Sequence, residues 1–159
     1  MMTFTGQPEE AEIYTDGSCQ TQSREGAWVA IILIGGDKTV LSGQVPNTTH
    51  NRMELLAVRE ALCYLETNNS SLRKLKIFAD SQYVIGISDR KNKLEASGYS
   101  TKKGSPIQNL DLVLDLLKLS ASFSIDWIKI KAHQKKGEGP NYNIDADKLA
   151  RKIVRERTR

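Results

Sequence analysis

The chain has 159 residues, of which 39% are hydrophobic and 26% are charged, a composition typical of one globular domain and not of a disordered chain. Two separated cysteines, Cys19 and Cys63, exclude a disulfide framework and a cysteine-based zinc site. The sequence has neither a signal-peptide pattern nor a run of about 18 apolar residues, so we expect a cytoplasmic protein with no membrane partner. The net charge of +4, with basic stretches at 90–103, 129–136 and 148–159, favours a phosphate backbone as partner, although each stretch alone is as typical of a solvated helix face.

The first part of the chain predicts a tail to about residue 10, followed by a hairpin-rich sheet. The segment 12–15 is expected to be a short strand that ends in a turn at Asp16-Gly17-Ser18. The unbroken apolar run 27–34 is typical of a buried strand. A glycine turn then leads into a third strand over 39–45.

Helices dominate the rest of the chain. A long helix runs to about Thr67, with a threonine or asparagine ahead of Glu54 as its N-terminal cap. The sequence then predicts a strand over 74–79, a helix over 82–90, a broken helix or loop over 91–105, a helix from Pro106 to about Ser120, a strand over 123–131, a loop over 133–142 and a last helix from about Asn143. The order β-β-β-α-β-α-α-β-α indicates an α/β fold, in which a single domain over 1–159 has a mixed sheet flanked by helices.

Four acidic residues lie at the ends of predicted elements, beside apolar sequence. Asp16 and Asp80 follow two strands, Glu54 heads an apolar helical row, and Asp147 lies in the first turn of the last helix. If the two strands are parallel neighbours, their carboxylates meet at the sheet edge where α/β folds bind ligands. Converging carboxylates need a hard cation such as Mg²⁺ or Mn²⁺, and two ions about 4 Å apart can clamp an in-line phosphoryl displacement. Taken singly, each acid would be an ordinary turn residue or helix cap.

Four short motifs contain these acids, namely 15–18 (TDGS), 51–55 (NRMEL), 80–84 (DSQYV) and 146–150 (ADKLA). In this order, and over about residues 12–155, they resemble the four motifs of the type 1 ribonucleases H, the bacterial ribonuclease HI-like family. TDGS alone is a weak signal, whereas the set at these distances is a strong one. The resemblance implies the ribonuclease H fold, a five-stranded mixed sheet whose first three strands are antiparallel. It also implies endonucleolytic cleavage of the RNA strand of an RNA–DNA hybrid, which leaves 3′-hydroxyl and 5′-phosphate ends.

The resemblance further implies roles for the four acids in a site for two Mg²⁺ ions, with Mn²⁺ as a substitute. Asp16 would bridge both ions, and Glu54 and Asp80 would complete the site near the leaving group. Asp147 would hold the ion that activates the water. The family pattern A-D-x-L-A places Asp147, and not Asp145, in this role, and Asp145 is expected to be a surface acid or an N-terminal cap.

Histidines are the next candidates. His133 follows the last predicted strand, where the family has a histidine on a mobile loop that assists proton transfer or product release. The alternative for His133 is a solvent-exposed loop histidine. His50 stands beside the asparagine of NRMEL and is expected to be non-catalytic.

The resemblance places substrate contacts beside the metal motifs and in the basic stretch 90–103. Short polar side chains and backbone groups there would sense 2′-hydroxyls and sugars in the minor groove, and the basic stretch would form a protrusion on the hybrid. These contacts are Ser18, Cys19, Thr49, Asn51, Gln82, Lys91, Lys93, Lys102 and Lys103. Gln22 stands where the family commonly has an asparagine that contacts DNA, so that contact is not expected here. The basic stretch has no tryptophan, so we expect it to stack more weakly on the hybrid. Each polar residue beside the metal motifs could alternatively serve as a cap or turn residue.

Two alternatives stay open. The first is a non-catalytic module that binds a hybrid or double-stranded RNA, which would require the loss of a metal ligand although all four motif acids are present. The second is a relative of the same fold that acts on branched DNA or is joined to a polymerase, which the close NRMEL and DSQYV matches and the chain length disfavour, while a retroelement-derived ribonuclease H domain stays open. We therefore expect a free-standing, monomeric enzyme whose partner is an RNA–DNA hybrid.

Overall fold

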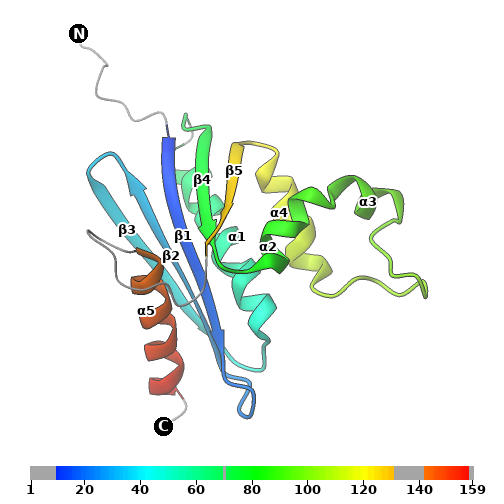
Figure 1. Ribbon diagram of the computed structural model, residues 1–159, viewed down its shortest axis with the longest axis horizontal. Helices are drawn as coiled ribbons and strands as arrows, with labels where there is room; N and C mark the ends of the chain where they lie inside the picture. Colours follow the sequence, from blue (N-terminus) through cyan, green and yellow to red (C-terminus); the bar gives the residue numbers. More distant parts are fainter. Residues whose placement is uncertain (1–9, 70, 131–141, 158–159) are drawn as a thin grey trace.

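A five-stranded sheet in the order β3-β2-β1-β4-β5 forms the centre of the computed structural model, which describes residues 10–69, 71–130 and 142–157 (Figure 1). Its antiparallel part consists of β1 (Glu10–Cys19), β2 (Gly26–Ile34) and β3 (Asp37–Val45). The parallel part adds β4 (Lys74–Ala79) beside β1 and β5 (Ser124–Lys129) beside β4. The predicted α/β fold with a five-stranded mixed sheet is therefore confirmed.

Helices cover both faces of this sheet (Figure 1). α1 (His50–Asn68) packs on β1, β2 and α4 (Leu110–Ser120), while α5 (Tyr142–Arg157) packs on β1 and β2 from the other side. Alternate residues of β2 serve the two layers, because Ala30 and Ile32 join the large core with α1, and Val29 and Ile31 join a smaller core with α5. This two-sided burial explains the unbroken apolar run of β2. No helix in the described part of the chain is long and apolar enough to cross a lipid bilayer.

Two helices follow β4. α2 (Gln82–Asp89) packs beside β4 and β5, whereas Figure 1 shows α3 (Lys91–Ala96) and the loop after it standing away from the sheet, and we call residues 91–105 the projecting segment. Of the stretch expected to be either a broken helix or a loop, residues 91–96 are helical. The element order is therefore β-β-β-α-β-α-α-α-β-α, with one helix more than predicted between β4 and β5.

The predicted turn at Asp16-Gly17-Ser18 is wrong. β1 continues through these residues to Cys19, and Gly17 pairs with Trp28 of β2. The residues have turn propensity, but the long ladder with β2 holds them extended and overrides it. At its other end β1 begins at Glu10, and the rest of the predicted tail lies outside the described residues.

The helix predicted from Pro106 begins later, at Leu110. Pro106 forms an isolated bridge with Ser100, and the Ile107 N–H donates to the Tyr99 carbonyl at 3.0 Å, so this part of the chain closes a loop. Asn109 then adopts a left-handed conformation with φ 57°, which separates the loop from the helix. The loop predicted over 133–142 lies outside the described residues, except for Tyr142, which begins α5.

Candidate active site

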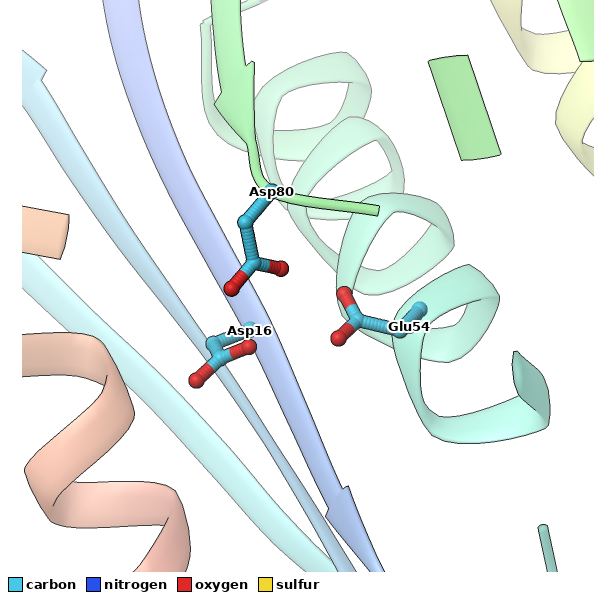
Figure 2. Close-up of side chains that lie close together, drawn as sticks. All are labelled: Asp16, Glu54 and Asp80. Atoms are coloured by element: carbon cyan, nitrogen blue, oxygen red, sulfur yellow. The ribbon is translucent and has the colours of Figure 1, made fainter. Parts of the chain in front are cut away.

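Three of the predicted carboxylates meet where β1 and β4 part (Figure 2). One ligand oxygen each of Asp16, Glu54 and Asp80 lies within 4.8 Å of the others. β1 and β4 are parallel with Tyr14 opposite Phe78, so Asp16 and Asp80 each stand two residues beyond this last pair. The Tyr14 and Phe78 rings stack with centroids 4.5 Å apart and hold the strands together just before the carboxylates. The parallel strands thus bring both acids to one sheet edge, as expected.

Glu54 reaches this edge from α1, and its side chain is fully buried. The helix begins with Thr49 as N-cap, whose side-chain oxygen accepts a hydrogen bond from the Arg52 backbone N–H at 3.2 Å. Gly17 lets strand and helix approach closely, because a Cβ there would lie 2.7 Å from the Glu54 backbone nitrogen and 2.8 Å from the Met53 carbonyl carbon. Glycine is therefore required at this position for close packing and not for a turn.

Asp147 faces the same pocket from the start of α5. The pocket has a volume of about 430 Å³ and is lined by Asp16, Gly17, Ser18, Cys19, His50, Asp80, Asp147 and Arg151. Asp147 Oδ1 accepts a hydrogen bond from Arg151 Nε at 3.1 Å, and the Asp147 carboxyl lies close enough to Asp16 to raise the pKa of Asp16. Asp145 is exposed and is not one of the lining residues. The structure thus brings all four predicted acids to one place.

Burial and mutual repulsion decide the charge of these acids. The pKa of Asp16 is raised far above its usual value, first by burial and then by the neighbouring charges of Glu54 and Asp80. Burial also raises the pKa of Glu54, against the opposing effect of His50, whose Nε2 lies 3.2 Å from Glu54 Oε1. Ionising all of these carboxyls together therefore requires a cation among them.

The donor set fits a hard divalent cation. Among the described residues, Asp16 Oδ2 and both carboxylate oxygens of Glu54 are buried without a hydrogen-bond donor. The His50 imidazole lies near Glu54 but lacks hydrogen-bond geometry. Buried oxygens of this kind are destabilising unless they are satisfied, and ligation by carboxylate oxygens is what Mg²⁺ and Mn²⁺ prefer.

Comparison with known proteins identifies the family of the chain. The family model for RNase H matches residues 8–155. The chain belongs to the ribonuclease H family. Ribonuclease H of Ehrlichia ruminantium (strain Gardel) is 40% identical over 144 residues, which are 89% of this chain and 92% of that protein. Ribonuclease H of Thermoanaerobacter sp. (strain X514) is 36% identical over 150 residues, with 93% and 92% covered.

A solved structure agrees with the ribonuclease H fold. It is the crystal structure of LC9-RNase H1, described as a type 1 RNase H with the type 2 active-site motif. The superposition has a TM-score of 0.78 and covers 96% of this chain and 74% of that chain, at 23% sequence identity. The family resemblance drawn from the four motifs is therefore confirmed.

The polar residues that the ribonuclease H resemblance assigns to substrate lie at or beside the carboxylates. Ser18 and Cys19 line the pocket itself. Thr49 and Asn51 line a neighbouring cavity of about 450 Å³ together with His50, Gln108 and Asn109. Gln82 is exposed at the first position of α2, two residues beyond Asp80. Thr49 also caps α1, so its side chain fulfils the capping alternative.

The predicted lysine contacts are not brought to the pocket. They lie on the projecting segment, which Figure 1 shows standing away from β1 and β4. Lys91 and Lys93 belong to α3, and Lys102 and Lys103 follow it in the chain, and all four are exposed. His133 lies outside the described residues.

Two further residues line this ribonuclease H pocket. His50 was expected to be non-catalytic, which stays a prediction, and Arg151 was considered only as part of a basic stretch. Each stands four residues from a predicted metal ligand on a helix, His50 before Glu54 and Arg151 after Asp147. Residues at this spacing share a helix face, so the signal was present once the ligands had been named.

Proposed function

We propose that this ribonuclease H cleaves the RNA strand of RNA–DNA hybrids as an endonuclease and leaves 3′-hydroxyl and 5′-phosphate ends. One observation carries the proposal: Asp16, Glu54 and Asp80 meet with ligand oxygens within 4.8 Å, in a chain that belongs to the ribonuclease H family. A non-catalytic binding module would have no need for buried carboxylates that repel one another, because their mutual repulsion destabilises the fold.

The proposed cofactor is a pair of Mg²⁺ ions, for which Mn²⁺ would substitute. Asp16 is central among the acids and would be shared by both ions, with Glu54 and Asp80 on the leaving-group side and Asp147 on the side of the attacking water. A pair of ions about 4 Å apart supplies an activated water and stabilises the leaving oxygen of an in-line displacement. The chain contributes the fixed positions of these ligands, because Asp16 lies in a strand paired on one side by β2 and Glu54 lies on a helix packed against that strand.

The proposed substrate contacts surround this cluster. Asn51 and Gln82 lie at the starts of α1 and α2, and they would reach sugars and base edges in the minor groove, where the 2′-hydroxyl distinguishes RNA from DNA. Ser18 and Cys19 would present groups to the RNA strand, and Thr49 would meet a DNA phosphate. His133 would assist proton transfer or product release.

The exposed lysines of the projecting segment would contact the phosphate backbone of the hybrid. Lys91, Lys93, Lys102 and Lys103 place positive charge at a distance from the carboxylates, where it can hold the duplex without disturbing the metal ligands. The proposed enzyme is a cytoplasmic monomer.

Cleavage of an end-labelled RNA–DNA hybrid tests the proposal, with RNA–RNA duplex, DNA–DNA duplex and single-stranded RNA beside it, in Mg²⁺ and in EDTA. We expect cleavage of the RNA strand of the hybrid alone, and only with the metal. Asp16→Asn should abolish cleavage, whereas Asp126→Asn, which changes an exposed carboxylate on β5, should preserve it. If the wild-type protein bound the hybrid without cutting it, the non-catalytic module would replace this proposal.

A further inference from the structure

The pocket lined by Asp16, Asp80 and Asp147 also contains an arginine. Arg151 lies on α5 one turn after Asp147, and it lines the same pocket of about 430 Å³. Its Nε donates a hydrogen bond to Asp147 Oδ1 at 3.1 Å, while its side chain stays 51% exposed. Arg151 is therefore fixed at one atom and open to solvent at the rest of its head group.

The guanidinium of Arg151 retains unused donors. An arginine has five N–H groups in a rigid planar fork. Within residues 10–69, 71–130 and 142–157, only Nε of Arg151 forms a hydrogen bond, and the terminal nitrogens Nη1 and Nη2 form none. Arg52 is the contrasting case, because its Nη1 and Nη2 bind both carboxylate oxygens of Asp111 at 3.0 and 2.6 Å. Arg52 is thus occupied by the fold, whereas Arg151 is oriented by the fold but not occupied.

The negative charge of the pocket favours a cationic side chain beside a bound phosphate. Asp16, Asp80 and Asp147 line the pocket, and a phosphodiester that approached them would be repelled. Among the lining residues, Arg151 is the permanently charged cation, since a histidine is charged only when protonated. A guanidinium fork matches two phosphate oxygens, which makes arginine well suited to hold a phosphate in place.

We propose that Arg151 binds a phosphate of the RNA–DNA hybrid at this pocket through Nη1 and Nη2, and that Asp147 positions it through Nε. This inference rests on the proposed function and adds a substrate contact to it. Asp147 then has two tasks at two oxygens, because Oδ1 holds the arginine while Oδ2 is left for the metal site. The competing explanation is that Arg151 only supports Asp147 and never contacts the substrate.

Binding of a fluorescent hybrid measured in EDTA over a series of salt concentrations separates these two explanations, because neither cleavage nor metal ligation contributes. For Arg151→Gln we expect the Kd to rise about tenfold, as for the loss of a charge-assisted hydrogen bond in a half-exposed site. We also expect the slope of log Kd against log salt to fall by about one, the change for one phosphate contact. Arg151→Lys keeps the charge but not the fork, so its slope should match the wild type while its affinity is intermediate.

Arg73→Gln is the matched control. It removes the same charge from an exposed arginine just before β4, and the six residues of that strand separate it from Asp80 by roughly 20 Å. We expect its Kd to lie within about twofold of the wild-type value, because the Arg73 side chain is exposed and donates a hydrogen bond to the Leu72 carbonyl and not to an acidic group. Thermal unfolding of all three variants identifies any loss of binding that comes from misfolding, and Arg151→Lys keeps the test valid if Arg151→Gln unfolds.

The possible results are distinct. If Arg151→Gln binds the hybrid in EDTA with the affinity and salt slope of the wild type, Arg151 makes no phosphate contact and the inference is overturned, whatever happens to cleavage. The same holds if Arg73→Gln weakens binding as much as Arg151→Gln does. Failure of the wild-type protein to cleave the hybrid in Mg²⁺ would instead overturn the proposed function, and the two failures are therefore read from different measurements.

Discussion

Replacing Gly17 by alanine should damage the active site although it changes no functional group. The new Cβ would lie 2.7 Å from the Glu54 backbone nitrogen and 2.8 Å from the Met53 carbonyl carbon, whereas ordinary contacts begin at 3.4 Å. Both obstacles are backbone atoms, so no side-chain rotation relieves the clash. Because the β2 ladder holds Gly17 opposite Trp28, we expect α1 to give way by about 0.7 Å and to carry Glu54 away from Asp16.

The size of the effect follows from this displacement. Overpacking of this kind costs about 1–3 kcal/mol of unfolding free energy. A misplacement of about 1 Å among reacting groups can cost about 100-fold in rate, so we expect hybrid cleavage to fall by about 10- to 100-fold. Urea unfolding and initial cleavage rates in saturating Mg²⁺ measure the two effects separately.

Gly36→Ala is the matched control, because a Cβ at Gly36 meets no atom within 4 Å and its backbone lies outside the left-handed region. It should leave both stability and cleavage unchanged. The reasoning would be refuted if Gly17→Ala cleaved the hybrid within about twofold of the wild-type rate. The close approach of β1 and α1 would then not control the distance between the carboxylates.

Two further predictions concern pH and metal. The raised pKa of Asp16 means that ionisation of its carboxyl opposes folding. In EDTA at pH 7, Asp16→Asn should therefore raise the unfolding free energy by on the order of 1 kcal/mol. This gain should disappear below about pH 4, where the carboxyl is protonated in both the folded and the unfolded state. Mg²⁺ at about 100 times its Kd should stabilise the wild type by about 2.7 kcal/mol and the variant by less, and equal gains would contradict a metal site at Asp16. Arg52 lowers the pKa of Asp111 to about 2 from a model-peptide value of 3.8. A group whose pKa is lowered by folding stabilises the fold at pH values above its unfolded-state pKa, and this stabilisation is lost as the pH falls through its folded-state pKa. The unfolding free energies of the wild type and Asp111→Asn, measured in urea, should therefore differ by a constant amount above about pH 4 and converge towards pH 2.

The elements that follow a strong local pattern could be predicted from the sequence. β4 has the predicted bounds because its alternating apolar residues end at an Asp-Ser step that no neighbouring strand extends. The segment 16–18 and the helix start at Pro106 were predicted wrongly, because local turn and helix-start signals compete with partners that are distant in the sequence. Trp28 and its neighbours in β2 decide the first case, and Tyr99 and Ser100 decide the second.

The meeting of the acids could not be derived from their residue types alone. Asp16 and Asp80 are 64 positions apart, and only the parallel register of Tyr14 with Phe78 places them at the same height in the sheet. The family resemblance supplied this information before the structure did. The pairing of Arg151 with Asp147 follows from helix geometry, but its importance emerges only once the pocket is seen to contain both residues.

The two faces of the sheet have apolar cores of unequal size, so the elements that carry the active-site residues are not equally stabilised by packing. Asp16, Glu54 and Asp80 are carried by β1, α1 and the end of β4, which share the large core, whereas α5 rests on a small cluster that includes Ala146 and Ala150. Elements with little buried apolar surface open at lower free energy than the rest of a protein. We therefore expect heating to detach Asp147 and Arg151 first, so that activity is lost while most of the secondary structure, measured by circular dichroism, is still intact.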